Sequence, residues 1–124
     1  MRFLESDEVF KCPCHVCRKS KSPHSISPIL VEKLNNMVSL SGNIFNVTSG
    51  YRCEAHNRDV GGSPKSQHLL GNAVDVTTLG DSHLAYQIVD AAMVHNITFI
   101  ELAPRHVHLD IREGETKLVF GSRG

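Results

Sequence analysis

The stretch RHVHLDIR, residues 105–112, decides the fold because apolar and polar side chains alternate along its whole length. Successive side chains of a β-strand point to opposite faces of a sheet, so every second residue shares a face. One face of this strand carries Val107, Leu109 and Ile111. The other face carries His106, His108, Asp110 and Arg112. The pattern predicts a strand that packs on a hydrophobic core with one face and offers polar groups to a functional site with the other.

A second informative stretch is SQHLLGNAVDV, residues 66–76, in which His68 precedes Asp75 by seven positions with Gly71 between them. The residues NAVDVT, 72–77, favour another strand, on which Asp75 points away from the apolar residues on either side of it. A tight turn at Gly71 would bring His68 and Asp75 together.

These two stretches together offer a possible zinc site. Zinc in a hydrolase needs three protein ligands and one open position, and it accepts imidazole nitrogen and carboxylate oxygen. His68, Asp75 and His108 would supply such a set. For a single isolated histidine, a surface or hydrogen-bonded role is the commoner one. Three suitable residues in one pattern favour the metal site over that alternative.

The rest of the chain predicts an α+β fold, with two main helices packed on a mostly antiparallel sheet. Apolar residues at helical spacing predict a helix over 28–40, with Ser27 as its N-cap and Pro28 at its first position. A second helix is expected over 82–95, with Asp81 as its cap. The expected strands are 43–48, 72–77, 97–101, 105–112 and 117–120.

Two other segments are expected to be largely irregular. Residues 1–27 predict an arm that carries cysteines, followed by a single compact domain over 28–124. The Gly-, Ser- and Pro-rich connection over 49–66 predicts at most one helical turn, at 53–58. Long loops in small domains are usually functional, so this connection is a candidate part of the site.

Overall charge and hydropathy exclude some classes of function. Thirteen basic residues balance thirteen acidic ones, which argues against nucleic acid or an anionic membrane as a partner. No stretch reaches the ~18 apolar residues of a membrane span, and the first ten residues lack the apolar run of a signal peptide. We therefore expect a soluble monomer without a membrane span.

The four cysteines form a cluster of three, Cys12, Cys14 and Cys17, and a distant fourth, Cys53. This is not the regular spacing of a disulfide framework. Closed zinc sites prefer four Cys or His ligands, so the cluster allows a second, structural zinc site completed by Cys53 or His15. Two disulfides or free buried thiols remain open as alternatives, and so does the redox compartment.

The block SGYRCEAHNRDVGGSPKSQHLLGNAVDV, residues 49–76, resembles the signature of the zinc D-alanyl-D-alanine carboxypeptidase family, which shares a fold with the hedgehog signalling domain. The likeness covers about residues 28–112 and is closest to the small phage and bacterial murein peptidases. It implies a zinc peptidase domain with one catalytic zinc on His68, Asp75 and His108. It also implies hydrolysis of an amide bond in the stem peptide of bacterial peptidoglycan, in the periplasm, outside the cell or after delivery by a phage. Which bond is cleaved does not follow from it.

The resemblance assigns roles to further residues. Arg52 is expected to hold a substrate carboxylate or carbonyl oxygen beside the metal, because a guanidinium suits bidentate contacts. Asn57 and Ser66 are expected to hydrogen-bond within the loop and the site. Glu101 is expected to be the general base. Many members place this carboxylate three positions before the last ligand, where this chain has Arg105.

Two polar neighbours of His108 on the strand have alternative roles. Asp110 is a second candidate for the base, or a residue that orients a ligand. His106 is expected either to donate a hydrogen bond to the developing oxyanion or to be merely solvated.

Two functions outside hydrolysis stay as alternatives. One is a zinc-bearing binding module of the same fold without catalysis, which needs neither Glu101 nor Arg52. The other is a nucleic-acid-binding zinc protein built on CPCHVC, residues 12–17, against which the balanced charge argues. A serine nucleophile is disfavoured because the chain contains no G-x-S-x-G motif.

Overall fold

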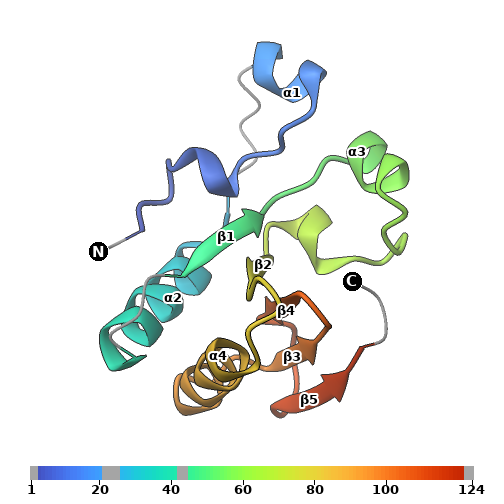
Figure 1. Ribbon diagram of the computed structural model, residues 1–124. Coiled ribbons are helices and arrows are strands. Elements are labelled where there is room, and N and C mark those ends of the chain that lie inside the picture. Colours follow the sequence, from blue (N-terminus) through green and yellow to red (C-terminus); the bar gives the residue numbers. More distant parts are fainter. Residues whose placement is uncertain (1–2, 21–25, 42–44, 122–124) are drawn as a thin grey trace.

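A five-stranded sheet forms the centre of the protein, in a computed structural model that describes residues 3–20, 26–41 and 45–121 (Figure 1). Its strand order is β1-β2-β4-β3-β5. The strands are β1 (Asn46–Ser49), β2 (Ala73–Thr77), β3 (Phe99–Leu102), β4 (His106–Asp110) and β5 (Lys117–Phe120). Each overlaps an expected strand, although positions 43 and 44 of the first one lie outside the described residues.

The sheet is mixed. Strands β1 and β2, β2 and β4, and β3 and β4 pair antiparallel, whereas β5 pairs parallel to β3. The α+β class is therefore confirmed, but the sequence analysis did not anticipate the parallel edge strand. The likeness to the hedgehog fold stays a prediction.

The two main helices begin at their expected caps. Helix α2 (Pro28–Ser41) starts directly after Ser27, whose Oγ accepts a hydrogen bond from the Leu30 amide at 3.5 Å. Helix α4 (Ser82–Val94) is capped by Asp81, whose side chain accepts from the His83 and Leu84 amides. Such caps satisfy amides that have no partner within the helix.

The hydrophobic core lies between these helices and one face of the sheet. From the sheet it contains Val74 and Val76 of β2, Ile100 of β3, and Val107 and Leu109 of β4, none of which has exposed surface. The helices contribute a set of buried apolar residues that includes Leu30, Leu34, Met37, Ile88 and Ala92. The alternation seen in residues 105–112 therefore places the core side of β4 correctly.

The described part of the N-terminal segment is more regular than the sequence predicts. It contains a short 3-10 helix, η1 (Glu8–Phe10), and a helix, α1 (His15–Ser20), while positions 1–2 and 21–25 lie outside the described residues. Phe10 and Ile26 are buried in the main core. The burial of these two side chains attaches the segment to the domain.

The long connection over 49–66 contains helix α3 (Glu54–Asp59), in agreement with the expected helical turn. It leads into a 3-10 helix, η2 (Gln67–Leu70), immediately before β2. In Figure 1 these elements lie on the opposite side of the sheet from α2 and α4. Within the described ranges, none of the helices has the length and apolar character needed to cross a membrane.

Candidate metal centre

Strand register brings three functional side chains into one row across the sheet. Asp75 of β2 lies opposite His108 of β4, and His108 lies opposite Glu101 of β3. Side chains directly opposite one another on neighbouring strands share a face and have Cβ atoms roughly 5 Å apart. The row faces away from α2 and α4, because the residues that alternate with it, Val74 and Leu109, point into the core.

His68 reaches this row from η2. The Ser66 Oγ caps η2 and accepts a hydrogen bond from the His68 amide at 3.2 Å. Gly71 ends η2 with φ of 72°, a left-handed conformation that glycine adopts without strain. The chain therefore turns directly into β2, as the sequence predicts, and the His68 side chain is brought beside Asp75.

The proton on His68 can be assigned from its surroundings. Its side chain is buried, and Nδ1 lies 2.7 Å from the Gly50 carbonyl oxygen, which can only accept a hydrogen bond. In the neutral ring Nδ1 therefore carries the proton, and Nε2 has a lone pair. Nε2 lies 3.3 Å from Asp75 Oδ1 but makes no hydrogen bond to any residue that the structure describes.

This arrangement fits a bound cation. A buried lone pair that faces a carboxylate oxygen is electrostatically unfavourable unless a positive charge lies between them. His108 Nδ1 approaches the same Asp75 Oδ1 at 3.0 Å, and one ligand atom from each of the three residues lies within 4.8 Å of the others. Two imidazoles and a carboxylate are ligands that zinc accepts, so the donor set suits that ion.

His108 is held between two carboxylates. Its Nε2 lies 2.7 Å from Oδ2 of Asp110, which has no exposed side-chain surface. Arg112 binds the two oxygens of Asp110 through Nη2, at 2.6 Å, and Nε, at 2.8 Å. Hydrogen bonding of a ligand histidine to a buried carboxylate fixes the ring for metal binding. Of the two roles expected for Asp110, its placement favours the orienting one.

The local fields shift three pKa values. Burial raises the pKa of Asp75, but hydrogen bonding to His108 and the proximity of His68 outweigh burial and hold that pKa well below its ordinary range. Burial lowers the pKa of His108, yet hydrogen bonds to Asp110 and Asp75 raise it to about 9. Burial likewise opposes ionisation of Asp110, and hydrogen bonds from Arg112 and His108 lower its pKa. Without metal, a doubly protonated His108 is thus stabilised between two anionic carboxylates.

Arg52 lies at the edge of the metal centre and contacts one of the proposed ligands. Its Nη2 forms an ion pair with Asp75 Oδ2 at 3.1 Å, and the two side chains are only 14% and 13% exposed. Its Nε donates to Ser49 Oγ at 3.1 Å, and its Nη1 donates to Asn57 Oδ1 at 3.3 Å. The guanidinium is therefore rigidly placed and also leaves Asp75 Oδ1 free to face the two histidines.

Asn57 makes hydrogen bonds within the loop and to Arg52. It is buried, and its amide nitrogen donates to the Ser63 carbonyl at 2.8 Å. A Cβ at Gly62 would lie 2.1 Å from the Asn57 Oδ1, so glycine is needed there for close packing. Asn57 thus joins the loop over 61–66 to Arg52.

Glu101 lies on the wall of an open cleft of about 460 Å³ beside the three proposed ligands. Residues 103–105 reverse the chain between β3 and β4, so Glu101 faces His108 although it is seven positions earlier. Arg105, three positions before His108, is exposed and lies near Gly80. Among the other residues that line the cleft are Arg52, Lys65, Ser66, His106 and Arg112.

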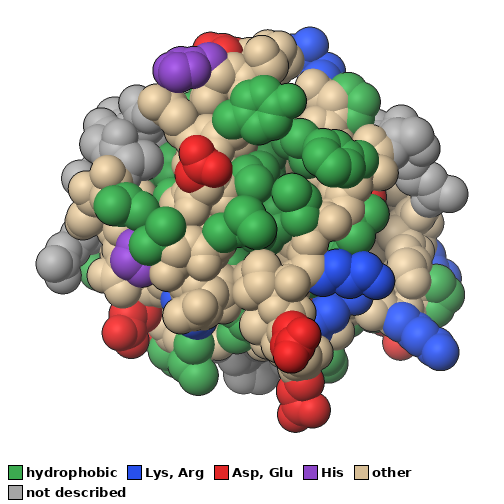
Figure 2. All heavy atoms as spheres, turned by 90° about the horizontal axis from the view of Figure 1, so that it is seen from below, with side chains coloured by type: hydrophobic (Ala, Val, Ile, Leu, Met, Phe, Trp, Pro, Cys, Tyr) green, Lys and Arg blue, Asp and Glu red, His purple; other side chains and the backbone are tan. Residues whose placement is uncertain are grey.

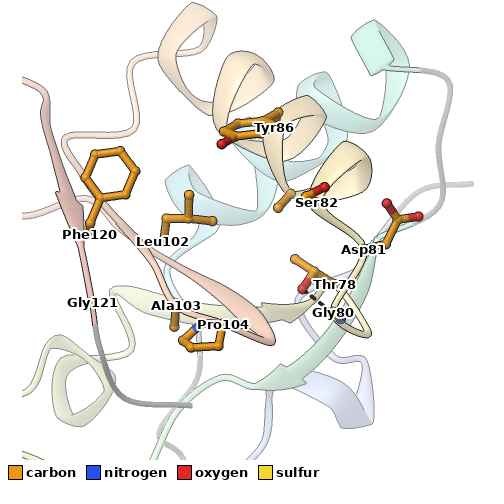
Figure 3. A pocket seen from close by; sticks show the side chains of 11 residues that line it. Thr78, Gly80, Asp81, Ser82, Tyr86, Leu102, Ala103, Pro104, Phe120 and Gly121 are labelled. Carbon is orange, nitrogen blue, oxygen red and sulfur yellow. Dashed lines mark hydrogen bonds between the residues drawn. The ribbon is translucent and has the colours of Figure 1, made fainter.

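A second hollow, of about 290 Å³, lies on the helix side of the sheet. Figure 2 shows apolar side chains gathered in the middle of the face that is seen from below in Figure 1. In Figure 3 Tyr86 of α4, Leu102 at the end of β3 and Phe120 of β5 surround the hollow. Neither of the two groups of potential metal ligands found in the described residues lines this hollow, so it is separate from the metal centre.

The sequence analysis missed two contributors to the centre. Gly50 acts through its backbone carbonyl, which accepts from His68, and a main-chain role leaves no signal in side-chain chemistry. Arg112 anchors Asp110, and its place on the polar face of residues 105–112 was a signal for this contact.

The four cysteines form a second group of potential metal ligands. The Sγ atoms of these residues all lie within 4.8 Å of one another, and none of the four thiols forms a disulfide. The residues are Cys12, Cys14, Cys17 and Cys53. His15 is exposed and is not part of this group.

The comparison with known families agrees with this geometry. A family model described as Peptidase M15 matches residues 4–110, which include the three proposed ligands and the four cysteines. No curated protein matches the chain. The chain therefore belongs to the peptidase M15 family, metallopeptidases of the zinc D-alanyl-D-alanine carboxypeptidase type, which confirms the resemblance in its sequence.

Proposed function

We propose that this protein hydrolyses an amide bond in the peptide part of bacterial peptidoglycan, with zinc held by His68, Asp75 and His108. The observation that carries the proposal is the buried Nε2 of His68, which faces Asp75 without a hydrogen-bond partner among the described residues, at the edge of an open cleft. A site that keeps one side open to solvent is typical of catalytic zinc rather than structural zinc.

In the proposed reaction, Glu101 and Asp110 have different roles beside the zinc. Zinc bound at such a site lowers the pKa of a coordinated water toward ~7 and polarises a carbonyl oxygen. In this proposal Glu101, which lies across from His108 on the neighbouring strand and lines the cleft, removes a proton from the attacking water and delivers it to the leaving amine. Asp110 has no exposed surface and is held by Arg112, so it orients His108 and does not exchange protons with substrate.

The lining of the cleft favours a substrate that carries carboxylates. Arg52, Lys65 and Arg112 line the cleft; Arg52 pairs with Asp75 and Arg112 with Asp110, so Lys65 adds a positive charge that these two carboxylates do not balance. Stem peptides of peptidoglycan contain free carboxylates beside the amide bonds that peptidases cleave, and guanidinium groups bind carboxylates well. Arg52 serves as the substrate clamp in this proposal, and His106 donates a hydrogen bond to the developing oxyanion. The site of action is then the bacterial cell wall.

The test is mass spectrometry of purified peptidoglycan fragments after incubation with the zinc-loaded protein. Wild type is expected to shorten the fragments, and a zinc chelator to stop the reaction. Glu101→Gln is expected to lose about 10²–10⁴-fold in kcat while retaining zinc, the usual contribution of a general base. The matched control is Glu115→Gln, at an exposed position outside the cleft, which should match wild type.

The variant Asp110→Asn distinguishes the role of Asp110 from that of Glu101. With zinc in excess it should keep much more activity than Glu101→Gln, because its expected defect lies in holding His108. Full activity in Glu101→Gln combined with a dead Asp110→Asn would reverse the two assignments. Intact fragments after incubation with zinc-loaded wild type would favour the non-catalytic binding module.

A further inference from the structure

We propose that Cys12, Cys14, Cys17 and Cys53 bind a second zinc ion in a closed structural site, which fixes the N-terminal segment to the loop that carries Arg52. The proposal does not depend on the substrate or on the catalytic role of the first site.

The spacing of the sulfur atoms suits a tetrahedral ion. Zinc–sulfur bonds of about 2.3 Å in a regular tetrahedron place neighbouring sulfurs about 3.8 Å apart. The Sγ atoms of Cys14 and Cys53 lie 3.6 Å apart, and all four sulfurs lie within 4.8 Å of one another. A disulfide needs a sulfur–sulfur distance of about 2.05 Å. Four sulfurs gathered around one point, rather than joined in two pairs, indicate that all four bind the same ion.

Backbone amides are arranged to stabilise thiolates. The amide of Cys17 points to the Cys14 Sγ at 3.4 Å, that of Cys53 to the Cys12 Sγ at 3.5 Å, and that of His56 to the Cys53 Sγ at 3.4 Å. Zinc ligation requires the deprotonated sulfur, and hydrogen bonds from amides compensate part of its negative charge. Three of the four sulfurs thus accept a hydrogen bond from the backbone.

The donor set distinguishes this site from the metal centre in the cleft. Soft thiolates favour zinc, copper(I) and iron–sulfur clusters, whereas the hard cations magnesium and calcium prefer oxygen ligands. Four protein ligands complete the tetrahedron and leave no position for water or substrate, which is the pattern of a structural site. Cys12 is buried, and the other three side chains are half-buried. His15, the other ligand that the sequence allowed, is exposed and lies outside the group.

The second site is linked to the first through residues 50–53. The Gly50 carbonyl accepts from His68, the Tyr51 amide donates to the Phe10 carbonyl at 2.9 Å, and the Arg52 amide donates to the His68 carbonyl at 3.1 Å. Cys53 follows directly. An ion that joins Cys53 to the N-terminal cysteines would hold this segment at both ends and would fix Arg52 against Asp75.

The experiment uses the full chain prepared under reducing conditions, with zinc counted by mass spectrometry and cobalt as a spectroscopic probe. Wild type is expected to bind two ions per chain, one for each group of ligands. Cobalt-loaded wild type should show intense thiolate-to-cobalt absorption in the near ultraviolet. Cys12→Ser is expected to lose one ion and also the thiolate absorption. His68→Ala should lose one ion but retain the thiolate absorption. His15→Ala is the matched control and should behave as wild type.

Several outcomes would overturn the proposal. One is cobalt-loaded wild type without thiolate absorption, a result that needs no variant to fold. Another is a chain whose four thiols resist alkylation after zinc removal under non-reducing conditions, which would indicate two disulfides. Loss of the thiolate absorption in His15→Ala would show that the ligand set is different. A wild type that binds both ions but leaves peptidoglycan intact would contradict the proposed function and leave this inference standing.

Discussion

At the scale of single residues, the position of His108 Nδ1 suits it to bind either a proton or a metal ion. It faces Asp75 Oδ1 at 3.0 Å, while Nε2 of the same ring faces Asp110 Oδ2 at 2.7 Å. Each carboxylate favours a proton on the nitrogen that it faces. A cation that replaces the Nδ1 proton preserves the attraction to Asp75, and the Nε2 proton remains with Asp110. The histidine can therefore exchange a proton for a metal without rearranging its neighbours.

This exchange predicts that zinc binding depends on pH. The pKa of His108 is raised from 6.5 to about 9, so the ring is protonated at neutral pH in the metal-free protein. Its ionic contribution to stability is fully present below about pH 6.5 and is lost as the pH rises through about 9. Zinc must displace this proton, so its apparent affinity should rise about tenfold per pH unit between about pH 7 and pH 8.

The measurement is calorimetric titration with zinc in buffers of different ionisation enthalpy. Release of at least one proton per ion at the cleft site is expected, with Cys12→Ser used so that only this site contributes. An affinity that does not change with pH over this range would mean that His108 is already neutral.

At the scale of elements, the alternation along β4 predicted which residues lie on each face of the strand. It therefore also predicted that His108 lies on the polar face. The caps Ser27 and Asp81 were equally local signals, so the starts of α2 and α4 were also predictable. The parallel pairing of β5 with β3 was not, because register between distant segments depends on packing that no local pattern records. The contact of His68 with the Gly50 carbonyl was not predictable either, because a backbone acceptor leaves no signal in the sequence.

Close packing of β1's end on η1 gives an element-scale prediction. A Cβ at Gly50 would lie 2.6 Å from the Phe10 Cα and 2.7 Å from its carbonyl oxygen, and backbone cannot move aside easily. Gly50→Ala should therefore lower the free energy of unfolding by about 1–3 kcal/mol, the usual cost of overpacking. It should also weaken zinc binding, because the Gly50 carbonyl orients His68.

Urea unfolding and zinc titration measure the two effects. Gly114→Ala is the comparison variant, since Gly114 does not line the cleft and a Cβ there meets nothing within 4 Å although φ is 122°. It should lose stability through backbone strain alone, roughly 1–2 kcal/mol, and keep wild-type zinc affinity. Equal zinc affinities in Gly50→Ala and wild type would contradict the orienting role of this carbonyl.

At the scale of the whole molecule, the sheet and its two helices form the platform, and the loop over 49–72 completes the metal centre on the open face. Of the residues that contact Asp75, His68 and Arg52 come from this loop, whereas His108 comes from the sheet. The loop has no strand of its own beyond Ser49, so its position depends on Phe10, Asn57 and the cysteine group. Correct geometry at the metal centre therefore depends on contacts made well outside it.

Removing the proposed second ion should consequently loosen one part of the molecule and leave the rest intact. A ligand that binds only the folded state stabilises what it contacts, and its loss exposes local opening. In Cys12→Ser with the cleft site loaded, hydrogen exchange should speed up in residues 10–20 and 50–57, including the amides of Cys17, Cys53 and His56. The paired strands β2 and β4 should keep their protection, because their register does not involve the cysteines.

Val16→Ser, at an exposed position of α1, controls for substitution in the same segment. Unchanged exchange around Cys53 would mean that the loop is held without the second ion, whereas increased exchange across the whole sheet would mean that the ion stabilises the entire fold.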